Sequence, residues 1–353
     1  MSSPPVTRRC FSASLAAAAG LTAVGRSWAN DSDEASAIDV HGRLSINDGK
    51  VVDQQGTPLS LAGPSLFWHN LGWAHNGGLE PGAYYNAASV RAALELWNAP
   101  IVRAAIGVET PGGYIENPGY AWARLTAVVD AAIDSGMYVI VDWHTHHAEE
   151  HVPAAHEFFA KVASRYSGHP NLIYELYNEP LPAADWQSVI KPYAEPLIDT
   201  IRKTDTENLI VVGTRSWSQD VDEAAESPIR DGGPLAYTLH FYAGTHCNGL
   251  RAKARRAVDA GLPLVVTEWG AINANGDGTA DIQETERWMQ FLREHKLTHC
   301  NWSLHSKEEG ASILQPGTPP DGLWGENALT ETGKLTTSIM RRWHTRRYLS
   351  KAD

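Results

Sequence analysis

Eight short apolar runs alternate with eight helical patterns along this chain of 353 residues, and this alternation limits the possible folds more than any other feature. We expect strands at 59–66, 100–106, 137–144, 171–178, 208–214, 235–242, 263–269 and 298–304. The helical patterns lie at 86–98, 120–135, 153–166, 185–204, 219–226, 250–260, 281–295 and 330–344. Such an alternation over about 300 residues predicts an α/β fold, a single (β/α)8 TIM barrel with a parallel sheet.

A doubly wound open sheet is the alternative fold. That fold ordinarily carries a glycine-rich phosphate-binding turn after its first strand, and the segment 63–68, Gly-Pro-Ser-Leu-Phe-Trp, is not such a turn. Ahead of the barrel pattern, Asp48 and Gly49 separate two short apolar runs, which predicts a short N-terminal β-hairpin. We therefore expect one domain without an appended binding module.

The first residues have the pattern of an export signal. Arg8 and Arg9 precede a modestly apolar run, which ends near a small-residue cleavage site at Ala29. The paired arginines favour the twin-arginine route, and an ordinary secretory signal is the alternative. We expect a periplasmic or secreted protein. The expected segments are an export signal, a loose arm, the folded domain and a C-terminal tail, at 1–29, 30–43, 44–345 and 346–353.

Charge and composition narrow the range of partners. The 41 acidic residues outnumber the 29 basic ones, which gives no electrostatic support for binding nucleic acid or an anionic membrane. No stretch is apolar for long enough to span a bilayer. Thirteen tryptophans are a heavy load, and their flat faces stack well on sugar rings, although about half should be core. We expect a monomer in which Cys247 and Cys300 are free, partly buried thiols.

Polar side chains recur near the carboxyl ends of the expected strands. Because side chains alternate along a strand, Arg103 is expected on the face of its strand that points into the barrel. His144, His240 and Tyr242 are expected on the same face of their own strands. Singly, each has an ordinary explanation: Arg103 could pair with a buried Glu175, and isolated histidines are mostly satisfied core residues. In a barrel, however, all these strand ends meet at one mouth, where active sites of this fold lie.

Two glutamates end strands in the same way. Glu179 follows the apolar run that starts at Leu172, and Glu268 follows a similar run much later. A carboxylate at the end of a buried strand is poorly solvated and needs a partner or a chemical use, and two of them are the raw material of paired-carboxylate chemistry. Asn178 and Glu179 can both face the mouth only if the strand is irregular just before Pro180.

A cluster of histidines and glutamates follows the third strand. Its spacing matches no common metal-ligand motif and the segment is predicted to be a loop, so we expect no metal and no other cofactor. The cluster comprises His144, His146, His147, Glu149, Glu150 and His151.

The motifs at these strand ends resemble a known family. The segments 174–180, Tyr-Glu-Leu-Tyr-Asn-Glu-Pro, and 267–270, Thr-Glu-Trp-Gly, are similar to the acid/base and nucleophile motifs of glycoside hydrolase family 5, the cellulase family. Segments 102–105, 142–144, 240–246 and 301–304 also match, in the family's order. The resemblance extends from about residue 40 to 345 and is closest to the bacterial endo-β-1,4-glucanases.

The resemblance implies a retaining endo-β-1,4-glucanase acting on cellulose or related β-glucans. Glu179 would be the general acid/base and Glu268 the nucleophile, with Arg103 and Tyr242 keeping Glu268 ionised. We expect burial and the charge of Glu268 to raise the pKa of Glu179. The implied sugar-binding residues are Arg103, His144, Asn178, His240, Tyr242, Trp302, Lys307 and Glu309, with a cis peptide bond after Trp302.

The sequence departs from the family near its first strand. The bacterial cellulases often carry a histidine soon after this strand's glycine and serine, and Trp68, His69 or Trp73 could take up that role here. This departure leaves β-mannan, xyloglucan or mixed-linkage glucan as alternative polymers. Two other functional classes remain open: a sugar-binding protein that has lost catalysis, and a metal hydrolase that uses the histidine cluster.

Overall fold

The computed structural model describes residues 35–70, 79–109 and 111–351. The chain divides into two units, Met1–Ser32 and Asp33–Asp353, and every described residue belongs to the second. The predicted export signal at 1–29 and the candidate Trp73 therefore lie outside the described residues.

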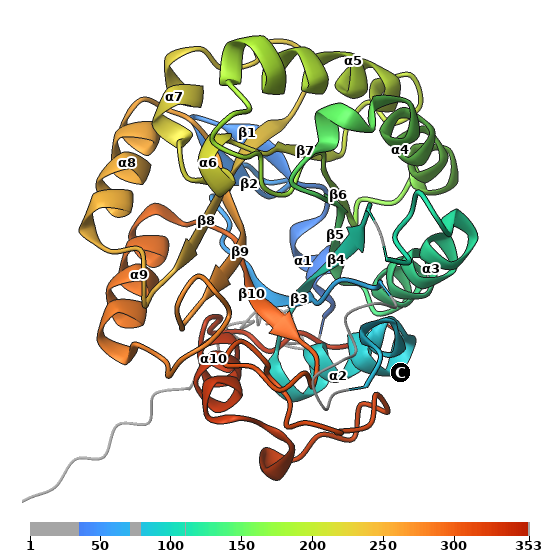
Figure 1. Cartoon of the computed structure of the whole chain (residues 1–353), viewed down its shortest axis with the longest axis vertical. Helices are drawn as coiled ribbons and strands as arrows, with labels where there is room; N and C mark the ends of the chain where they lie inside the picture. Colours follow the sequence, from blue (N-terminus) through green and yellow to red (C-terminus); the bar gives the residue numbers. More distant parts are fainter. Residues whose placement is uncertain (1–34, 71–78, 110, 352–353) are drawn as a thin grey trace, which may run out of the picture. The chain divides into compact units, whose positions relative to one another are not determined.

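Eight parallel strands close into a barrel, seen along its axis in Figure 1, which confirms the predicted (β/α)8 fold. The strand order is β10-β3-β4-β5-β6-β7-β8-β9, so the first and last barrel strands pair with each other. The strands are β3 (Ala62–Leu66), β4 (Ile101–Gly107), β5 (Tyr138–His144), β6 (Leu172–Glu175), β7 (Leu209–Val212), β8 (Leu235–Tyr242), β9 (Leu264–Gly270) and β10 (His299–Leu304).

Helices surround the barrel as predicted, and side-chain caps fix where several of them begin. The side chains of Asn86, Asn117, Asp281 and Thr330 each accept a hydrogen bond from a backbone N–H in the first turn. The helices are α2 (Ala87–Trp97), α3 (Pro118–Asp134), α4 (Val152–Tyr166), α5 (Lys191–Arg202), α7 (Val221–Glu226), α8 (Asn248–Asp259), α9 (Ile282–His295) and α10 (Glu331–Arg341).

Shorter elements connect the main ones, and of these only η4 falls within a helical stretch that the sequence predicted, at 185–204. One of them, η4, is a π-helical turn that leads directly into α5. No helix within the described residues is both long and apolar enough to cross a membrane. The short elements are η2 (Pro81–Tyr84), η3 (Ala148–Glu150), η4 (Trp186–Ile190), α6 (Arg215–Ser218) and η5 (Glu326–Ala328).

The predicted hairpin is present ahead of the barrel as β1 (Ser45–Asn47) and β2 (Lys50–Val52). Its two turn residues have positive φ, as a tight Asp-Gly hairpin turn requires. The arm expected to be loose instead contains α1 (Ala37–His41), because Ser36 caps this helix and Ala37 is buried.

The predicted C-terminal tail also packs against the domain. Tyr348 is buried, forms a β-bridge with Ala35, and its hydroxyl lies 2.9 Å from His41 Nε2. Residues near both ends of the described chain therefore pack together. Cys247 and Cys300 are both free, as predicted, but neither is partly buried: Cys247 is exposed in the loop just before α8, and Cys300 is fully buried in β10.

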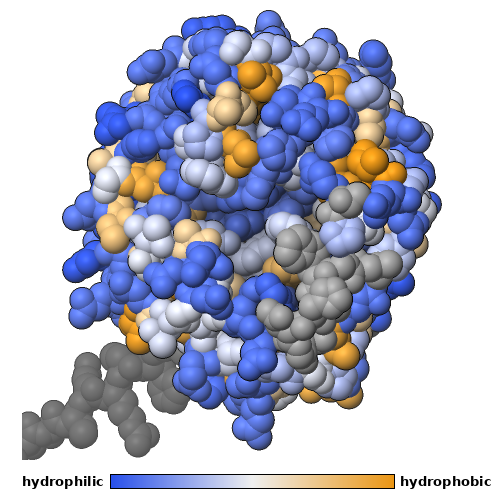
Figure 2. All heavy atoms as spheres, viewed as in Figure 1, coloured by the Kyte–Doolittle hydropathy of each residue, from blue (hydrophilic) through white to orange (hydrophobic). Residues whose placement is uncertain are grey.

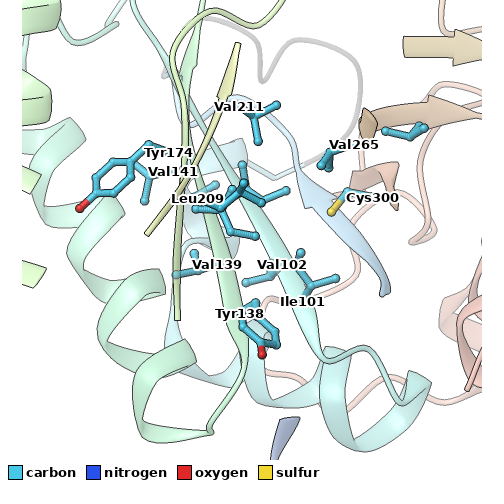
Figure 3. Close-up of a cluster of buried hydrophobic side chains, with 14 of the residues drawn as sticks. Ile101, Val102, Tyr138, Val139, Val141, Tyr174, Leu209, Val211, Val265 and Cys300 are labelled. Carbon is cyan, nitrogen blue, oxygen red and sulfur yellow. The ribbon is translucent and has the colours of Figure 1, made fainter. Parts of the chain in front are cut away.

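Every residue of the eight barrel strands is buried, because helices cover the outside and side chains fill the inside. Figure 3 shows part of this packing, with Val102, Val139, Leu209, Val265 and Cys300 drawn from five different strands. A polar side chain on such a strand therefore needs a partner within the protein.

Candidate active site

The chain leaves regular pairing at the end of β6, and this break aims two polar residues into the barrel mouth. β6 ends at Glu175, before the predicted end at 178. The backbone then pairs again with the end of β5: Asn178 N–H donates to Trp143 O and Glu179 N–H to Thr145 O, both at 3.3 Å. Asn178 and Glu179 can therefore both serve the mouth, which answers the geometric requirement that the sequence posed.

Tyr177 takes up the irregularity by turning away from the mouth. Its hydroxyl donates to His146 O at 2.7 Å and lies 2.5 Å from a Glu149 carboxylate oxygen. Strict alternation from Glu175 would put Tyr177 on the same face as Glu175 and Glu179, but regular alternation stops at Glu175, where β6 ends.

A left-handed turn is hydrogen-bonded to the segment that carries Asn178 and Pro180. Ser216, Trp217 and Ser218 have φ of 58°, 57° and 56°, a conformation that costs roughly 1–2 kcal/mol for each non-glycine residue. Trp217 N–H donates to Pro180 O at 2.8 Å, and Ser218 Oγ donates to Asn178 O at 2.7 Å. The turn leaves the Trp217 ring 42% exposed beside the mouth. Strain of this kind persists where the surrounding contacts hold it, often at functional sites.

Arg103 joins the buried acids of the mouth. Its Nε lies 2.7 Å from Glu175 Oε2, its Nη2 lies 2.9 Å from Asp142 Oδ2, and its Nη1 lies 3.1 Å from Glu268 Oε2. Nη2 also donates to Asn178 Oδ1 at 2.6 Å, so the amide NH₂ of Asn178 must point elsewhere and is available as a donor. One cation thus holds three carboxylates, from β5, β6 and β9, and one amide from the segment after β6.

We expect Arg103→Met to destabilise the fold by about 3–5 kcal/mol, because buried carboxylates lose their counter-charge. Burial, against the effect of Arg103, raises the pKa of Asp142 to about 7, so the folded chain binds this proton more tightly than the unfolded chain does. Removing Arg103 raises the pKa of Asp142 further. The destabilisation should therefore be largest above about pH 7 and shrink as the pH falls.

Urea unfolding midpoints at several pH values test this prediction. Arg103→Lys keeps the charge but not the forked geometry, and it should be less destabilising than Arg103→Met. A loss of stability in Arg103→Met that is the same at about pH 5 and about pH 8 would contradict the assigned role.

Glu268 is held in a form suited to nucleophilic attack. Its Oε2 receives Arg103 Nη1, and its Oε1 accepts the Tyr242 hydroxyl at 2.7 Å. Burial and the nearby charge of Glu268 raise the pKa of Tyr242, so the phenol keeps its proton and donates it. Both partners therefore donate to the carboxylate, one to each oxygen.

The two strand-end glutamates lie together as predicted. Glu179 and Glu268 have carboxylate oxygens within 4.8 Å of each other. They line a cavity of about 330 Å³, with Trp217, His240 and Tyr242 among its other walls. Figure 2 shows this face of the molecule, with largely hydrophilic side chains around a central hollow. Two carboxyl groups at this separation suit double displacement, whereas inversion needs a gap of about 6.5–9.5 Å.

Hydrogen-bond directions require a proton between Glu179 and His240. The Thr267 hydroxyl donates to Glu175 Oε1 at 2.5 Å, and Arg103 binds that carboxylate with two nitrogens. Thr267 Oγ1 must then accept from His240 Nε2, which lies 2.8 Å away. His240 Nδ1 faces Glu179 Oε1 at 2.9 Å, so one of the two must carry a proton. The site therefore stores one proton within the pair formed by Glu179 and His240.

The pKa of Glu179 in the free protein differs from the expectation. Burial raises it, but hydrogen bonds from His146 and His240 outweigh burial and hold the pKa below its usual value. The expectation of a raised pKa was wrong because it did not include two imidazoles on one carboxyl. The pair Glu179–His240, and not the isolated carboxyl, thus holds the proton.

Aromatic rings form an apolar wall of the mouth. Trp302 stacks on His144 at 5.3 Å and packs against Phe67 at 5.2 Å, while Trp68 lies 5.0 Å from His144. The peptide bond Trp302-Ser303 is cis, as predicted. Burial, with Arg103 nearby, lowers the pKa of His144 to about 3, and its Nδ1 lies 2.7 Å from Asp142 Oδ2. A neutral His144 donating to Asp142 keeps Nε2 as an acceptor.

The remaining predicted sugar-binding residues differ in where they lie. Lys307 lies 5.3 Å over the Phe67 ring and pairs with Glu309, which also lies 3.0 Å from His305, so both stand beside the apolar wall. His69 is fully buried, and its Nδ1 accepts from Gly107 N–H at 3.2 Å. The prediction that His69 binds sugar was therefore wrong, because the ring packs under the mouth instead of lining it.

Sequence reasoning missed three functional candidates. His146 binds Glu179, but the sequence had grouped it only with a metal cluster. Thr267 looked like an ordinary strand residue, and its proton link to His240 depends on side-chain directions. No sequence pattern around Trp217 predicts three consecutive left-handed residues, so Trp217 could not be recognised as a candidate.

Metal binding at this site would compete with existing contacts. Within the described residues, Glu179, His240 and Glu268 form the group whose potential ligand atoms lie within 4.8 Å of one another. All three are already joined to imidazole, hydroxyl or guanidinium partners in the protein. A larger cavity, of about 690 Å³, lies between α9 and α10, and the described residues that line it include no histidine.

Comparisons with known proteins agree with one another. Residues 52–308 match the family described as cellulase, glycosyl hydrolase family 5. The chain is 46% identical over 300 residues to Endoglucanase Z of Dickeya dadantii, covering 85% of this chain and 66% of that protein. It is 37% identical over 323 residues to Endoglucanase N of Pectobacterium atrosepticum, covering 91% and 70%. The chain thus spans about two thirds of these relatives' lengths.

Solved structures resemble this one closely. A structure from Cytophaga hutchinsonii has a TM-score of 0.82 with 44% identity, covering 87% of this chain and 96% of that one. The catalytic domain of Thermobifida fusca endoglucanase Cel5A has a TM-score of 0.79 with 30% identity, covering 86% and 99%. A variant of that Thermobifida domain was solved in complex with cellotetraose.

Proposed function

Because this chain belongs to the cellulase family, glycosyl hydrolase family 5, we propose that it is an endo-β-1,4-glucanase that cleaves cellulose or related β-glucans with retention of configuration. The observation that carries the proposal is the short gap between Glu179 and Glu268, within 4.8 Å, next to a stored proton. The relatives named as endoglucanases support the same activity.

In the first step, a carboxylate oxygen of Glu268 attacks the anomeric carbon while Glu179 gives its proton to the leaving glycosidic oxygen. The bond from that carbon to the leaving sugar breaks, and a glycosyl ester with Glu268 forms. Tyr242 and Arg103, which hold the carboxylate before attack, also steady its oxygens as the charge is lost.

In the second step, water enters where the leaving sugar stood. Glu179, now ionised, takes a proton from that water, and the hydroxide oxygen attacks the anomeric carbon and releases Glu268. The two inversions return the sugar to the β configuration. The proton taken from water restores the Glu179–His240 pair for the next cycle.

The walls of the mouth suit a β-linked glucan. The NH₂ of Asn178, set by Arg103, would donate to the 2-hydroxyl of the sugar being cleaved, while Trp302 would lie under its ring. Trp217, exposed on the other side of Glu179, would stack on the leaving sugar. Lys307, Glu309 and Trp68 would contact more distant sugars.

We propose an exported, monomeric enzyme that needs no cofactor. The export signal follows from the sequence of residues 1–29, and the acidic surface fits a neutral polysaccharide as the partner better than nucleic acid or an anionic membrane.

Assays on a panel of polymers test the proposed function. Reducing sugar should appear from carboxymethylcellulose faster than from β-mannan, and NMR of the first products should show the β anomer. Lichenan and xyloglucan resolve the alternative polymers. Activity should be unchanged by a chelator, whereas a metal hydrolase would lose it. If no β-glucan is cleaved but oligosaccharides bind tightly, the chain is a sugar-binding protein.

A further inference from the structure

Two imidazoles hold the carboxyl of Glu179 from opposite oxygens. His240 Nδ1 lies 2.9 Å from Oε1, and His146 Nε2 lies 3.0 Å from Oε2. The two differ in exposure, since the side chain of His240 is 1% exposed and that of His146 is 38% exposed. Of the two, His146 is therefore the one that can take up a proton directly from water.

Hydrogen bonds within its loop fix the backbone position of His146. Tyr177 donates its hydroxyl hydrogen to the His146 carbonyl at 2.7 Å, and His147 N–H donates to Thr145 Oγ1 at 2.8 Å. Thr145 Oγ1 in turn donates to Glu109 in the loop after β4. His146 also lines a cavity of about 190 Å³ that opens beside the mouth.

We propose that His146 is a positioning residue that acts through Glu179: its Nε2–H holds Oε2, and protonation of its other ring nitrogen, Nδ1, decides whether Glu179 is ionised or carries the acid proton. The inference rests on the proposed function, in which Glu179 is the acid/base. It adds a histidine that no assigned role of the site includes.

The charge on His146 determines whether the proton shared by Glu179 and His240 lies on Glu179 or on His240. With His146 neutral, its Nε2–H donates to Glu179 while the proton shared with His240 stays available to the acid. A proton on His146 Nδ1 places a positive charge 3.0 Å from the carboxyl, which favours ionised Glu179 and moves the shared proton to His240. That second state holds the same geometry but has no acid proton on Glu179.

Other charged groups also face His146, and they set the direction of its titration. Glu179, Glu268 and Glu109 lie around it and favour its cation, while His144 on the same strand end would oppose it if charged. Burial lowers the pKa of His146, but the hydrogen bond and charge of Glu179 outweigh burial and raise it. The unproductive state is therefore populated up to a pH above the usual range of a histidine.

His146→Gln tests the proposal, because the glutamine amide can donate from nearly the same place but cannot be charged. The acid limb of kcat/KM should move to lower pH by about one unit at low salt, since the charge that favours ionised Glu179 at acidic pH is gone. At the highest pH the two profiles should converge, because His146 is then neutral in the wild type as well.

His147→Gln is the matched control. His147 is the next residue, 47% exposed, and its Nδ1 lies 3.7 Å from Glu150 instead of Glu179. Its replacement should leave the pH profile unchanged. A structural role for His146 would lower kcat/KM equally at all pH values, and that result, or an equal shift in both variants, would overturn the proposal.

An NMR titration separates this proposal from the proposed function. The carboxyl carbon of Glu179, assigned by its loss in Glu179→Gln, should shift in wild type at the pH where the His146 ring titrates. This step should vanish in His146→Gln. If the wild type cleaves no β-glucan, the proposed function fails, while the NMR result still decides the coupling. Independent titration of the two groups would refute it.

Discussion

Glu268→Gln is expected to lower kcat on β-glucan by at least about 10⁴-fold while the fold stays intact. Glutamine has nearly the same shape, and its one carbonyl oxygen can still accept from Arg103 while its NH₂ donates to the Tyr242 oxygen, but a neutral amide cannot form the glycosyl ester. The loss should appear in kcat and not in KM, because the sugar-binding walls are unchanged. Turnover measured with purified variant and thermal unfolding measured alongside check both halves of the statement.

A matched variant shows that burial alone does not explain the effect. Glu284 on α9 is 4% exposed, pairs with Arg251 and Arg287, and is not among the residues that line the cavity of Glu179 and Glu268. Glu284→Gln should keep kcat within about two-fold. In wild type, a 2-fluoro glycosyl fluoride should label the peptide that contains Glu268, since it forms the ester but hydrolyses it slowly. Labelling of another residue would remove Glu268 from its role.

Glu179→Ala should reduce cleavage of natural glucan by about 10²–10⁴-fold, because the leaving oxygen no longer receives a proton. A substrate with an acidic dinitrophenyl leaving group needs no such proton, so formation of the glycosyl ester should be nearly preserved. Hydrolysis of that ester would then be slow, and the ester would accumulate as an initial burst of dinitrophenol. The two substrates measured side by side give the contrast.

Azide provides the control for this variant. Without the Glu179 carboxylate, a small anion can enter beside the ester and release a β-glycosyl azide, so azide should speed turnover of the activated substrate. The alkaline limb of kcat/KM should also disappear, since it reports loss of the acid proton. Equal losses on both substrates, with no response to azide, would show that Glu179 is not the acid/base.

The fold was predictable from the sequence because strands buried on both faces give apolar runs of the right length. The polar ends were also predictable: period two places Arg103, His240 and Tyr242 on one face, and barrel closure brings those ends together. What side-chain alternation could not give was the path after Glu175, where pairing breaks and Tyr177 turns outward.

The remaining differences have physical reasons of the same kind. The pKa of Glu179 depends on two imidazoles, one of which, His146, reaches it only through the folded loop after β5. Trp217 depends on a left-handed turn whose stability comes from bonds to Pro180 and Asn178, outside its own segment. His69 looked available because it follows a strand, yet its ring packs inward against Tyr120.

The pairing of β10 with β3 has a consequence for folding during synthesis. β3 is made early on the ribosome and β10 near the end, so the ring stays open until the segment His299–Leu304 has emerged. Trp302 is on that final strand, whereas Glu179 and Glu268 are made earlier. A nascent chain therefore carries both acids before it has a closed ring to hold them, and activity should arise in one event late in synthesis.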